Sequence, residues 1–487
     1  MYRESGTPLT KIIATLGPAS DELDTILELI REGVRCFRIN FSHGDFEEYE
    51  SRVHRVREAS ERTGVLVSVL GDLSGPKIRL GQVVTGGVKL APDDEVFFVR
   101  HEVVAGAAEG PIEFSTNYDH FLDEVQPGEA VLLNDGNVRL RAEGRDGDRL
   151  CCRVVHGGNL TSRKGVNLPD TELSVPALTE RDRRCAAFAI QHGFDLLALS
   201  FVRRGRDVEM LREELQRIGA PHDFPICAKI EKPQAIDDLA AILDASDFVM
   251  VARGDLGVEM DIAEVAVIQR GIVDRCHERG VPVIVATQML ESMIHAPVPT
   301  RAEVSDVANA IFQSVDAVML SGETAVGRYP VETVKMMGRV VSKTNVYIRR
   351  KQIATATPSH PRGSRRTEAL AEATKSIGKA LDVKLIAAWC DVASMRDFSK
   401  HHIQRPILAF GADPVELRFT CLLYGIAPIH ISMPETGRDF VAQVDEFIKE
   451  KGWAESGDAI LLVLGSGHHG TGPADKVHVH YIDNPNA

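Results

Sequence analysis

Short apolar runs alternate with amphipathic helical segments along most of this chain, and this alternation limits the folds open to it. The runs are Lys11–Gly17, Cys36–His43, Leu66–Gly75, Phe194–Phe201, Pro225–Glu231, Asp247–Asp255, Pro282–Gln288 and Asp316–Glu323. They are rich in Val, Ile and Leu, which is typical of strands buried on both faces of a parallel sheet. Eight such units predict an α/β fold of the TIM (β/α)8 barrel type, with the active site at the carboxyl ends of the strands. A doubly wound open sheet is the alternative architecture.

The alternation is interrupted once, and a further region follows it. Residues 77–175 show short strand-like pieces, many glycines and no long helical periodicity, which predicts an inserted all-β, barrel-like lid domain. The barrel domain then comprises residues 1–76 and 176–350. A linker rich in Ser, Thr, Pro and Arg spans residues 355–367. The strand-like and helical patterns beyond it predict a C-terminal α/β domain over residues 351–487.

Composition excludes several classes of protein. The chain has 487 residues, a net charge of −14 and 44% hydrophobic residues, as expected for an ordinary globular protein of about two to four domains. The negative charge argues against general nucleic-acid binding. Eight cysteines without a CxxC pair favour neither a disulfide framework nor a zinc site. Neither a membrane span nor a secretory signal is evident, so we expect no membrane partner and a reducing cytoplasm as the compartment.

Three helix starts are predicted from capping residues. Ser20 precedes apolar residues at helical spacing and offers an N-cap. Thr179 with Asp182, and likewise Thr300 with Glu303, have the spacing of a capping box. We therefore expect helices to begin at these three places.

Charged residues concentrate at the ends of two consecutive predicted strands. Lys229 and Glu231 are two positions apart, and alternation along a strand places both side chains on one face. Asp255 follows the next strand. An amine and two carboxylates at neighbouring strand ends suggest a metal-assisted site for a phosphorylated substrate. An ordinary ion pair on a strand edge is the other interpretation of this stretch taken alone.

Further polar residues stand at the ends of other predicted strands. They are Arg38, Asn40, Ser42, Asp72, Arg79 and Thr287. A guanidinium such as that of Arg38 suits a phosphate through its planar fork of donors. Paired carboxylates can hold a divalent metal that bridges phosphoryl and enol oxygens. A nearby lysine can stabilise the charge that develops on transfer, so the strand ends together favour phosphoryl chemistry.

Ten longer motifs closely resemble those of the pyruvate kinase family. They are TKIIATLGPAS from Thr10, FRINFSHG from Phe37, GDLSGPKIR from Gly71, RKGVNLP from Arg163, SFVRR from Ser200, AKIEK from Ala228, VMVARGDLGVE from Val249, ATQMLESM from Ala286, PTRAEVSDVANAI from Pro299 and DAVMLSGETAVGRYP from Asp316. They span the predicted barrel and insert in the family's order, and runs of this length are highly specific. The resemblance is weaker beyond about residue 345.

The resemblance implies transfer of the phosphoryl group of phosphoenolpyruvate to ADP, then protonation of the enolate, giving pyruvate and ATP in the last step of glycolysis. It also implies a homotetramer. By this resemblance Lys229 stabilises the transition state, and Glu231 and Asp255 bind Mg²⁺ or Mn²⁺. The implied substrate contacts are Arg38, Lys229, Gly254, Asp255 and Thr287, and the implied nucleotide contacts are Arg79, Lys164, His43 and Asn40. Lys164 would reach in from the insert as the lid closes and excludes water.

One departure from the family pattern concerns potassium. In members that need K⁺, a glutamate occupies the position of Lys77, and residues that match Asn40, Ser42 and Asp72 bind the ion. Here the lysine ammonium supplies positive charge near the substrate phosphate. This is the pattern of the K⁺-independent branch, so the sequence predicts that K⁺ is not required.

A second departure concerns regulation. Many relatives carry a Ser/Thr-rich loop after the first strand of the last domain, which grips a sugar-phosphate effector. Here the loop from Trp389 to Arg396 reads WCDVASMR, with few hydroxyls and an acid where a phosphate would sit. This argues against activation by fructose 1,6-bisphosphate.

Two other classes of function remain open at this point. One is a different enzyme that uses phosphoenolpyruvate or pyruvate on the same barrel, against which the nucleotide-side residues Arg79 and Lys164 argue. The other is a catalytically silent regulatory homologue, against which the intact set of charged strand-end residues argues. Pyruvate formation that depends strictly on ADP separates all three.

Overall fold

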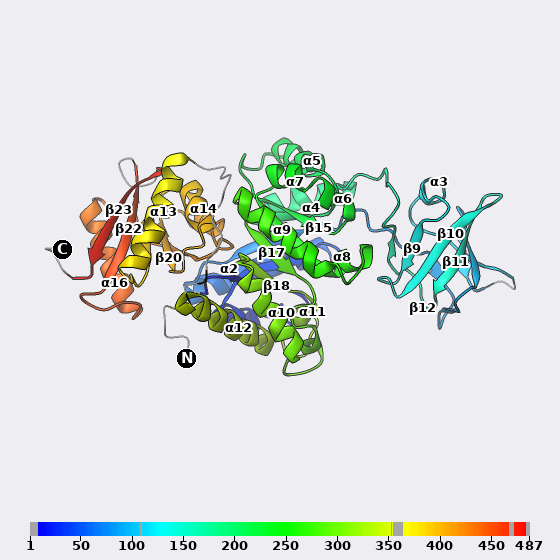
Figure 1. Ribbon diagram of the computed structural model, residues 1–487, viewed down its shortest axis with the longest axis horizontal. Coiled ribbons are helices and arrows are strands. Elements are labelled where there is room, and N and C mark those ends of the chain that lie inside the picture. The colour runs from blue at the N-terminus through cyan, green and yellow to red at the C-terminus, as the bar shows by residue number, and fades with distance from the viewer. Residues whose placement is uncertain (1–7, 108–109, 352, 354–363, 467–471, 484–487) are drawn as a thin grey trace.

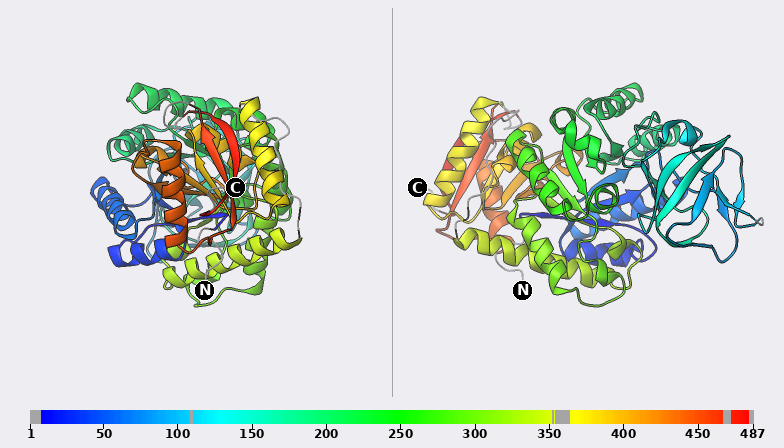
Figure 2. Two further views of the ribbon diagram at one scale, coloured as in Figure 1. Left: turned by 90° about the vertical axis from the view of Figure 1, so that its left-hand side faces the viewer. Right: turned by 45° about the vertical axis from the view of Figure 1, so that its right-hand side comes forward.

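The computed structural model describes residues 8–107, 110–351, 353, 364–466 and 472–483. Three parts lie in a row along the long axis: the C-terminal part, a barrel in the middle, and a β-rich part at the far end (Figure 1). Two further views show helices around the barrel and the β-rich part projecting beyond it (Figure 2).

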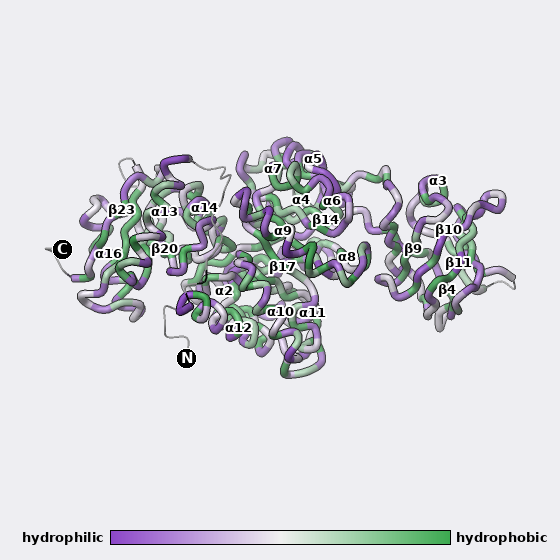
Figure 3. The backbone as a smooth tube through the Cα atoms, in the orientation of Figure 1, coloured by the Kyte–Doolittle hydropathy of each residue, from purple (hydrophilic) through white to green (hydrophobic). Residues whose placement is uncertain are grey.

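The central part is a closed barrel of parallel strands in the order β1-β18-β17-β16-β15-β14-β3-β2. Its strands are β1 (Lys11–Thr15), β2 (Val34–Asn40), β3 (Ser68–Asp72), β14 (Leu196–Val202), β15 (Ile226–Ile230), β16 (Phe248–Ala252), β17 (Val283–Ala286) and β18 (Ala317–Leu320). Every residue of β1, β3, β15 and β16 is buried, and Figure 3 shows hydrophobic residues along the barrel strands. The predicted TIM barrel is confirmed, and the open-sheet alternative is wrong.

Helices cover the outside of the barrel and connect its strands. They are α1 (Leu23–Arg31), α2 (Phe46–Thr63), α4 (Glu180–Gln191), α5 (Gly205–Arg217), α6 (Pro233–Asp237), α7 (Leu239–Ala245), α8 (Arg253–Glu259), α9 (Val265–Arg279), the 3₁₀ helix η1 (Glu291–Ile294), α10 (Arg301–Phe312), α11 (Gly322–Ala325) and α12 (Pro330–Lys351). Short helices such as α8 directly follow strand ends, so they place side chains at the barrel mouth.

Two of the three predicted helix starts are confirmed. Helices α4 and α10 each begin with a capping box, in which a threonine and an acidic residue bond each other's backbone amides. The third is wrong, because α1 begins at Leu23 with Glu22 as its N-cap. Ser20 Oγ instead accepts a hydrogen bond from the Gly17 amide and donates one to the Thr15 carbonyl. Its hydroxyl therefore closes the turn after β1.

The elements between β3 and α4 form sheets outside the barrel, and we call β4 to β13 the lid. They are β4 (Gln82–Val83), β5 (Val88–Leu90), β6 (Glu95–Phe98), β7 (Val104–Ala105), β8 (Ile112–Phe114), α3 (Phe121–Glu124), β9 (Ala130–Leu133), β10 (Val138–Asp146), β11 (Arg149–His156), β12 (Gly158–Leu160) and β13 (Val166–Asn167). Six strands form one sheet in the order β13-β9-β10-β11-β6-β8. Phe98, Phe114 and Phe121 pack in a core of the lid's own.

The C-terminal part is a five-stranded sheet in the order β21-β20-β19-β22-β23, in which β23 alone is antiparallel to its neighbour. Its elements are α13 (Arg365–Ala380), β19 (Ile386–Trp389), α14 (Val392–Lys400), β20 (Ile407–Gly411), α15 (Pro414–Arg418), β21 (Ile426–His430), α16 (Gly437–Glu450), β22 (Ala459–Gly465) and β23 (Ala474–Tyr481). This confirms the predicted α/β region. Among the residues described, no helix has the length and apolar character needed to cross a membrane.

Candidate active site

The side chain of Lys229 lies at the carboxyl end of β15 and is almost fully buried. Its Nζ is 2.9 Å from Glu231 Oε1 and 3.2 Å from Asp72 Oδ1, and it donates a hydrogen bond of 2.8 Å to Ser200 Oγ. Burial alone would lower the pKa of Lys229, but the two carboxylates outweigh burial and raise this pKa above its ordinary value. The ammonium therefore stays charged near neutral pH, and it suits electrostatic stabilisation rather than proton transfer.

Asp72, at the end of β3, lies between two cations. Arg38 Nε donates a hydrogen bond of 2.7 Å to Asp72 Oδ2, and Arg38 Nη1 donates one of 3.1 Å to Thr15 Oγ1. Burial would raise the pKa of Asp72, but Lys229 and Arg38 together lower it below its ordinary value. Asp72 is thus a permanent anion that holds both cations in place.

Glu231 and Asp255 come from neighbouring strand ends but differ in setting. Glu231 is 1% exposed, and its Oε2 accepts a hydrogen bond of 2.8 Å from the Phe201 amide. Asp255 lies in the first turn of α8, because β16 ends at Ala252. Burial raises the pKa of Glu231; Lys229 opposes this shift, and the charge of Asp255 adds to it. Two oxygen-donor groups that repel each other in this way fit a divalent cation such as Mg²⁺.

Thr287 follows β17 in a backbone conformation that a β-branched residue rarely adopts. Its φ is 68°, and this left-handed geometry costs about 1–3 kcal/mol of conformational free energy. Thr287 Oγ1 accepts a hydrogen bond of 2.6 Å from the Gly254 amide, and Arg253 Nη2 donates one of 2.9 Å to the Thr287 carbonyl. A Cβ at Gly254 would lie 3.3 Å from Thr287 Oγ1. The close approach therefore favours glycine and fixes the strained hydroxyl beside α8.

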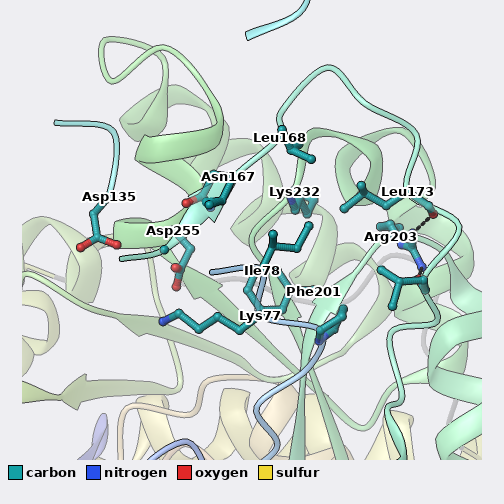
Figure 4. Close-up of a pocket in the computed structure, with 14 residues that line it drawn as sticks. Lys77, Ile78, Asp135, Asn167, Leu168, Leu173, Phe201, Arg203, Lys232 and Asp255 are labelled. Carbon is teal, nitrogen blue, oxygen red and sulfur yellow. Dashed lines mark hydrogen bonds between the residues drawn. The ribbon is translucent and has the colours of Figure 1, made fainter. Parts of the chain in front are cut away.

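Several cations gather between the barrel and the lid. Lys77, Arg79 and Arg181 line one cleft there. Partial desolvation and the charges of Lys77 and Arg79 lower the pKa of His43, which places this histidine beside the same cluster. Lys77 also lines a second pocket together with Asp255, as Figure 4 shows. The barrel mouth thus joins the carboxylate set to a positively charged region suited to polyphosphate.

Lys164 lies on the lid, between β12 and β13. Its carbonyl accepts a hydrogen bond of 2.8 Å from the Leu80 amide, and the Arg163 carbonyl accepts one of 3.2 Å from Arg79 Nη1. The adjacent Gly165 lines the pocket of Figure 4. The segment is therefore at the lid side of the site, although the Lys164 ammonium has no ion-pair partner among the described residues.

The side chains of Asn40, Ser42 and Asp72 already have polar partners within the protein. Asn40 Oδ1 accepts a hydrogen bond of 3.0 Å from the Ser42 amide, and Ser42 Oγ donates one of 3.1 Å to Ser74 Oγ. Asp72 is bound by Arg38 and Lys229 as described above. Lys77 lines the same cleft as Ser42 and Ser74.

Ser200, near the end of β14, belongs to the charged cluster but is absent from the residues predicted for it. Its hydroxyl donates a hydrogen bond of 2.6 Å to the Leu73 carbonyl and accepts the one from Lys229. The sequence did contain a signal for Ser200: its hydroxyl stands within an apolar run, and a buried polar group needs a hydrogen-bond partner.

Comparison with known families agrees with this geometry. The family model "Pyruvate kinase, barrel domain" matches residues 7–334, and the model "Pyruvate kinase, alpha/beta domain" matches residues 368–480. The chain belongs to the pyruvate kinase family. Pyruvate kinases transfer the phosphoryl group of phosphoenolpyruvate to ADP, giving pyruvate and ATP, and they generally use Mg²⁺ or Mn²⁺. The predicted function is thereby confirmed.

Individual pyruvate kinases match over nearly the whole chain. That of Mycobacterium intracellulare is 40% identical over 474 residues, covering 97% of this chain and 98% of the relative. That of Bacillus licheniformis is 37% identical over 474 residues, covering 96% of this chain and 80% of the relative. A crystal structure of a pyruvate kinase from Cryptosporidium parvum has a TM-score of 0.87 at 30% identity, covering 98% of this chain and 96% of the other.

Proposed function

We propose that this chain carries out the pyruvate kinase reaction with Lys229 as the electrostatic stabiliser of the transferred phosphoryl group, and without K⁺. One observation supports this most strongly: the Lys229 ammonium is buried between Glu231 and Asp72. A fixed positive charge in a water-poor site stabilises charge that develops on the phosphoryl oxygens, and it needs no reorganisation. Arg38, oriented by Asp72, binds the phosphate of phosphoenolpyruvate through its remaining donors.

Glu231 and Asp255 are the proposed ligands of Mg²⁺, or of Mn²⁺ in its place. A bound divalent cation neutralises charge on the phosphoryl and enol oxygens of the substrate. Glu231 is suited to this role because the Phe201 amide, bound to Oε2, fixes the orientation of the carboxylate, and Oε1 lies 2.9 Å from the Lys229 ammonium proposed to act on the same phosphoryl group. Asp255 offers its carboxylate from the first turn of α8.

Thr287 and the backbone of Gly254 contact the substrate from the adjacent strand end. The Gly254 amide already orients the Thr287 hydroxyl, so little rotational freedom is lost when substrate binds. Asp255 follows Gly254 directly, so one short segment contributes both a substrate contact and a metal ligand.

The nucleotide is bound on the side where the lid meets the barrel. Arg79 and Lys164 contact its phosphates, and Asn40 and His43 lie beside it. The lowered pKa of His43 keeps this ring neutral near pH 7, so it acts as a hydrogen-bonding group. Closure of the lid over the nucleotide excludes water from the phosphoryl donor.

Lys77 takes the place of the monovalent cation. Its ammonium adds positive charge to a cleft that Ser42 also lines. The polar groups of Asn40, Ser42 and Asp72 already have hydrogen-bond or ion-pair partners within the protein. The test is a coupled assay of pyruvate formation with Mg²⁺ in a buffer free of monovalent metal ions. We expect full activity without KCl for the wild type and K⁺-dependent activity for Lys77→Glu. Lys89→Glu, an exposed change on the lid, is the matched control. Strong stimulation of the wild type by KCl would contradict the proposal.

Three further features complete the proposal. The protein assembles as a homotetramer in the cytoplasm, as the family resemblance implies. Its units are a catalytic barrel of residues 1–76 and 176–350, a lid of residues 77–175 and a C-terminal unit of residues 351–487. Light scattering of the purified protein tests the assembly, and a mass of one or two chains would contradict it.

Fructose 1,6-bisphosphate does not activate this protein. The loop after β19 places Asp391 at the start of α14, where its carboxylate accepts a hydrogen bond of 2.8 Å from the Ser394 amide. A phosphate would have to displace this carboxylate and overcome its charge. Activity that is unchanged by fructose 1,6-bisphosphate is the expected result, and a clear rise in activity would refute it.

A further inference from the structure

Glu259, the last residue of α8, joins the barrel to the lid. Its Oε1 accepts a hydrogen bond of 2.6 Å from Lys232 Nζ in the barrel and one of 2.7 Å from Asn167 Nδ2 in the lid. Glu259 and Lys232 are each 5% exposed. One buried carboxylate oxygen therefore serves both parts of the molecule at the barrel mouth.

Breaking the contact between Glu259 and Lys232 would cost free energy, because both charged groups are buried. In the described part of the chain Glu259 Oε2 is buried and has no hydrogen-bond partner, so the bonds to Lys232 and Asn167 both pass through Oε1. The Lys232 ammonium also lies 5.9 Å from the centre of the Phe201 ring. Removal of a partner from a buried charge leaves that charge uncompensated. Lys232 thus holds the Glu259 carboxylate in place on the barrel, where its Oε1 also accepts the hydrogen bond from Asn167 of the lid.

On the lid side, Asn167 is tied firmly to the segment that carries Lys164. Asn167 pairs with Leu132 in the β13–β9 ladder. The Val166 amide donates to the Ile78 carbonyl at 3.0 Å, and the Leu80 amide donates to the Lys164 carbonyl at 2.8 Å. The position of Asn167 therefore sets the position of the Lys164 backbone.

On the barrel side, Glu259 closes the helix that begins with the substrate- and metal-binding residues. Helix α8 runs from Arg253 to Glu259 and contains Gly254 and Asp255. Lys232, its other partner, directly follows Glu231. The Asn167–Glu259 hydrogen bond thus links helix α8, which carries the proposed metal ligand Asp255, to the lid segment that carries Lys164.

We propose that Glu259 is a positioning residue that latches the lid, through Asn167, in one orientation over the nucleotide region. The latch holds Lys164 in register with α8, and its effect on nucleotide binding rests on the role of Lys164 in the proposed function. Without the latch the lid samples a wider range of positions, so fewer molecules present Lys164 correctly to the nucleotide. Phosphoenolpyruvate, which binds to barrel residues, does not depend on it.

The test uses the full-length protein with Asn167→Ala and Glu259→Gln. Asn137→Ala is the matched control, because Asn137 Nδ2 donates at 2.7 Å to the Asn134 carbonyl within the lid. Spin labels attached through non-natural amino acids at the exposed Lys89 of the lid and Glu332 of α12 report the lid-to-barrel distance. We expect a broader distance distribution for Asn167→Ala without ligands, and a wild-type distribution for the control.

Steady-state kinetics provides the second measurement. Asn167→Ala should raise KM for ADP by about tenfold, as loss of one hydrogen bond to a charged group permits, with KM for phosphoenolpyruvate little changed. Glu259→Gln keeps an acceptor for Asn167 and should raise KM for ADP less. The two changes together should be less than multiplicative, because they act on the same bond.

An unchanged distance distribution in Asn167→Ala would overturn the latch, whatever the kinetics. Equal increases in both KM values, with a lower unfolding temperature, would also overturn it, since they indicate general loss of structure. A broadened distribution with an unchanged KM for ADP would support the latch and refute the proposed role of Lys164.

Discussion

Two buried lysines at opposite ends of the barrel have opposite pKa shifts. Lys229, at the carboxyl end of β15, has a raised pKa because Asp72 and Glu231 outweigh the effect of burial. Lys11, at the amino end of β1, is 0% exposed, and burial followed by the charge of Arg35 lowers its pKa to about 7. Its Nζ donates to the Ile426 carbonyl at 2.6 Å and to the Pro8 carbonyl at 3.0 Å. Neighbouring groups, rather than depth of burial, decide which lysine keeps its charge.

The carboxylates at the two ends of the barrel also differ in the groups that they contact. Aspartates directly before β14, β16 and β18 each accept a hydrogen bond from the backbone of a neighbouring strand. Each also contacts a basic side chain of the C-terminal part: Asp195–Arg418 at 2.8 Å, Asp247–Arg396 at 3.1 Å and Asp316–His402 at 3.5 Å. These carboxylates connect two parts of the molecule. The carboxylates at the amino end of the barrel therefore stabilise the fold, whereas the carboxyl end carries Glu231 and Asp255, the proposed metal ligands.

The largest expected effect separates the two lysines. Lys229→Met should lower kcat by about 10²–10³-fold, because a preorganised charge is lost from the transition state. Lys11→Met should leave kcat close to the wild-type value, since the Lys11 ammonium donates to backbone carbonyls at the opposite end of the barrel. The measurement is steady-state pyruvate formation, with thermal unfolding as the control for folding. Similar losses of kcat in both variants would remove the distinction between the two ends.

The next effect concerns stability. Asp195→Ala should lower the free energy of unfolding by about 3 kcal/mol, because it leaves the Arg418 guanidinium and the Val69 amide without their partner at a buried site. Glu172→Ala, which breaks the exposed Arg204–Glu172 pair of 2.9 Å, should change it by less than about 1 kcal/mol. Chemical denaturation followed by circular dichroism compares the two. Equal effects would show that the amino-end carboxylate has no special structural role.

A smaller effect depends on pH. The folded pKa of Lys11, about 7, lies below its unfolded value of about 10.4. Between these values the unfolded chain binds more protons than the folded one, so this group makes stability rise as pH increases from about 7 toward 10. From pH 7 to pH 9 the stability of the wild type relative to Lys11→Met should rise by about 2 kcal/mol. A flat difference over this range would show that the lysine stays charged.

The smallest expected effect concerns the metal. Glu231, a proposed ligand of Mg²⁺, must lose its proton to bind the metal, and its pKa is raised above the ordinary value of 4.5. The affinity for Mg²⁺ should therefore start to fall at a pH above 4.5 as the solution is acidified, with uptake of a proton as metal is released. Calorimetry in buffers of different ionisation enthalpy measures both quantities. Glu231→Gln is the control and should lose the proton linkage.

Sequence patterns predicted strands and helix starts, which depend on neighbouring residues, and missed contacts between residues far apart in the chain. The apolar runs located the eight barrel strands along the chain, and the capping boxes at Thr179 and Thr300 located two helix starts, because each signal lies within a few residues. The same approach misplaced the start of α1 at Ser20 and extended a strand to Asp255, where a short helix had already begun. A serine can close a turn as readily as cap a helix.

The contacts that join distant segments could not be predicted in this way. The bond of Lys229 to Ser200 spans 29 residues, and that of Asn167 to Glu259 spans 92. Contacts between the barrel and the C-terminal part join residues still farther apart, such as Asp195 and Arg418 at 223 residues and Lys11 and Ile426 at 415. Such contacts depend on the closed geometry of the barrel and on how its parts pack, which no local pattern contains.

The most direct test of the account is the rate of phosphoryl transfer on the enzyme itself. Wild-type protein and Lys229→Met, each loaded with saturating Mg²⁺ and phosphoenolpyruvate, are mixed with ADP in a rapid-quench apparatus, and ATP is measured in a single turnover. We predict that the transfer step of the variant is slower by about 10²–10³-fold at saturation. A wild-type transfer rate at saturation, with only weaker binding of phosphoenolpyruvate, would contradict the role assigned to Lys229.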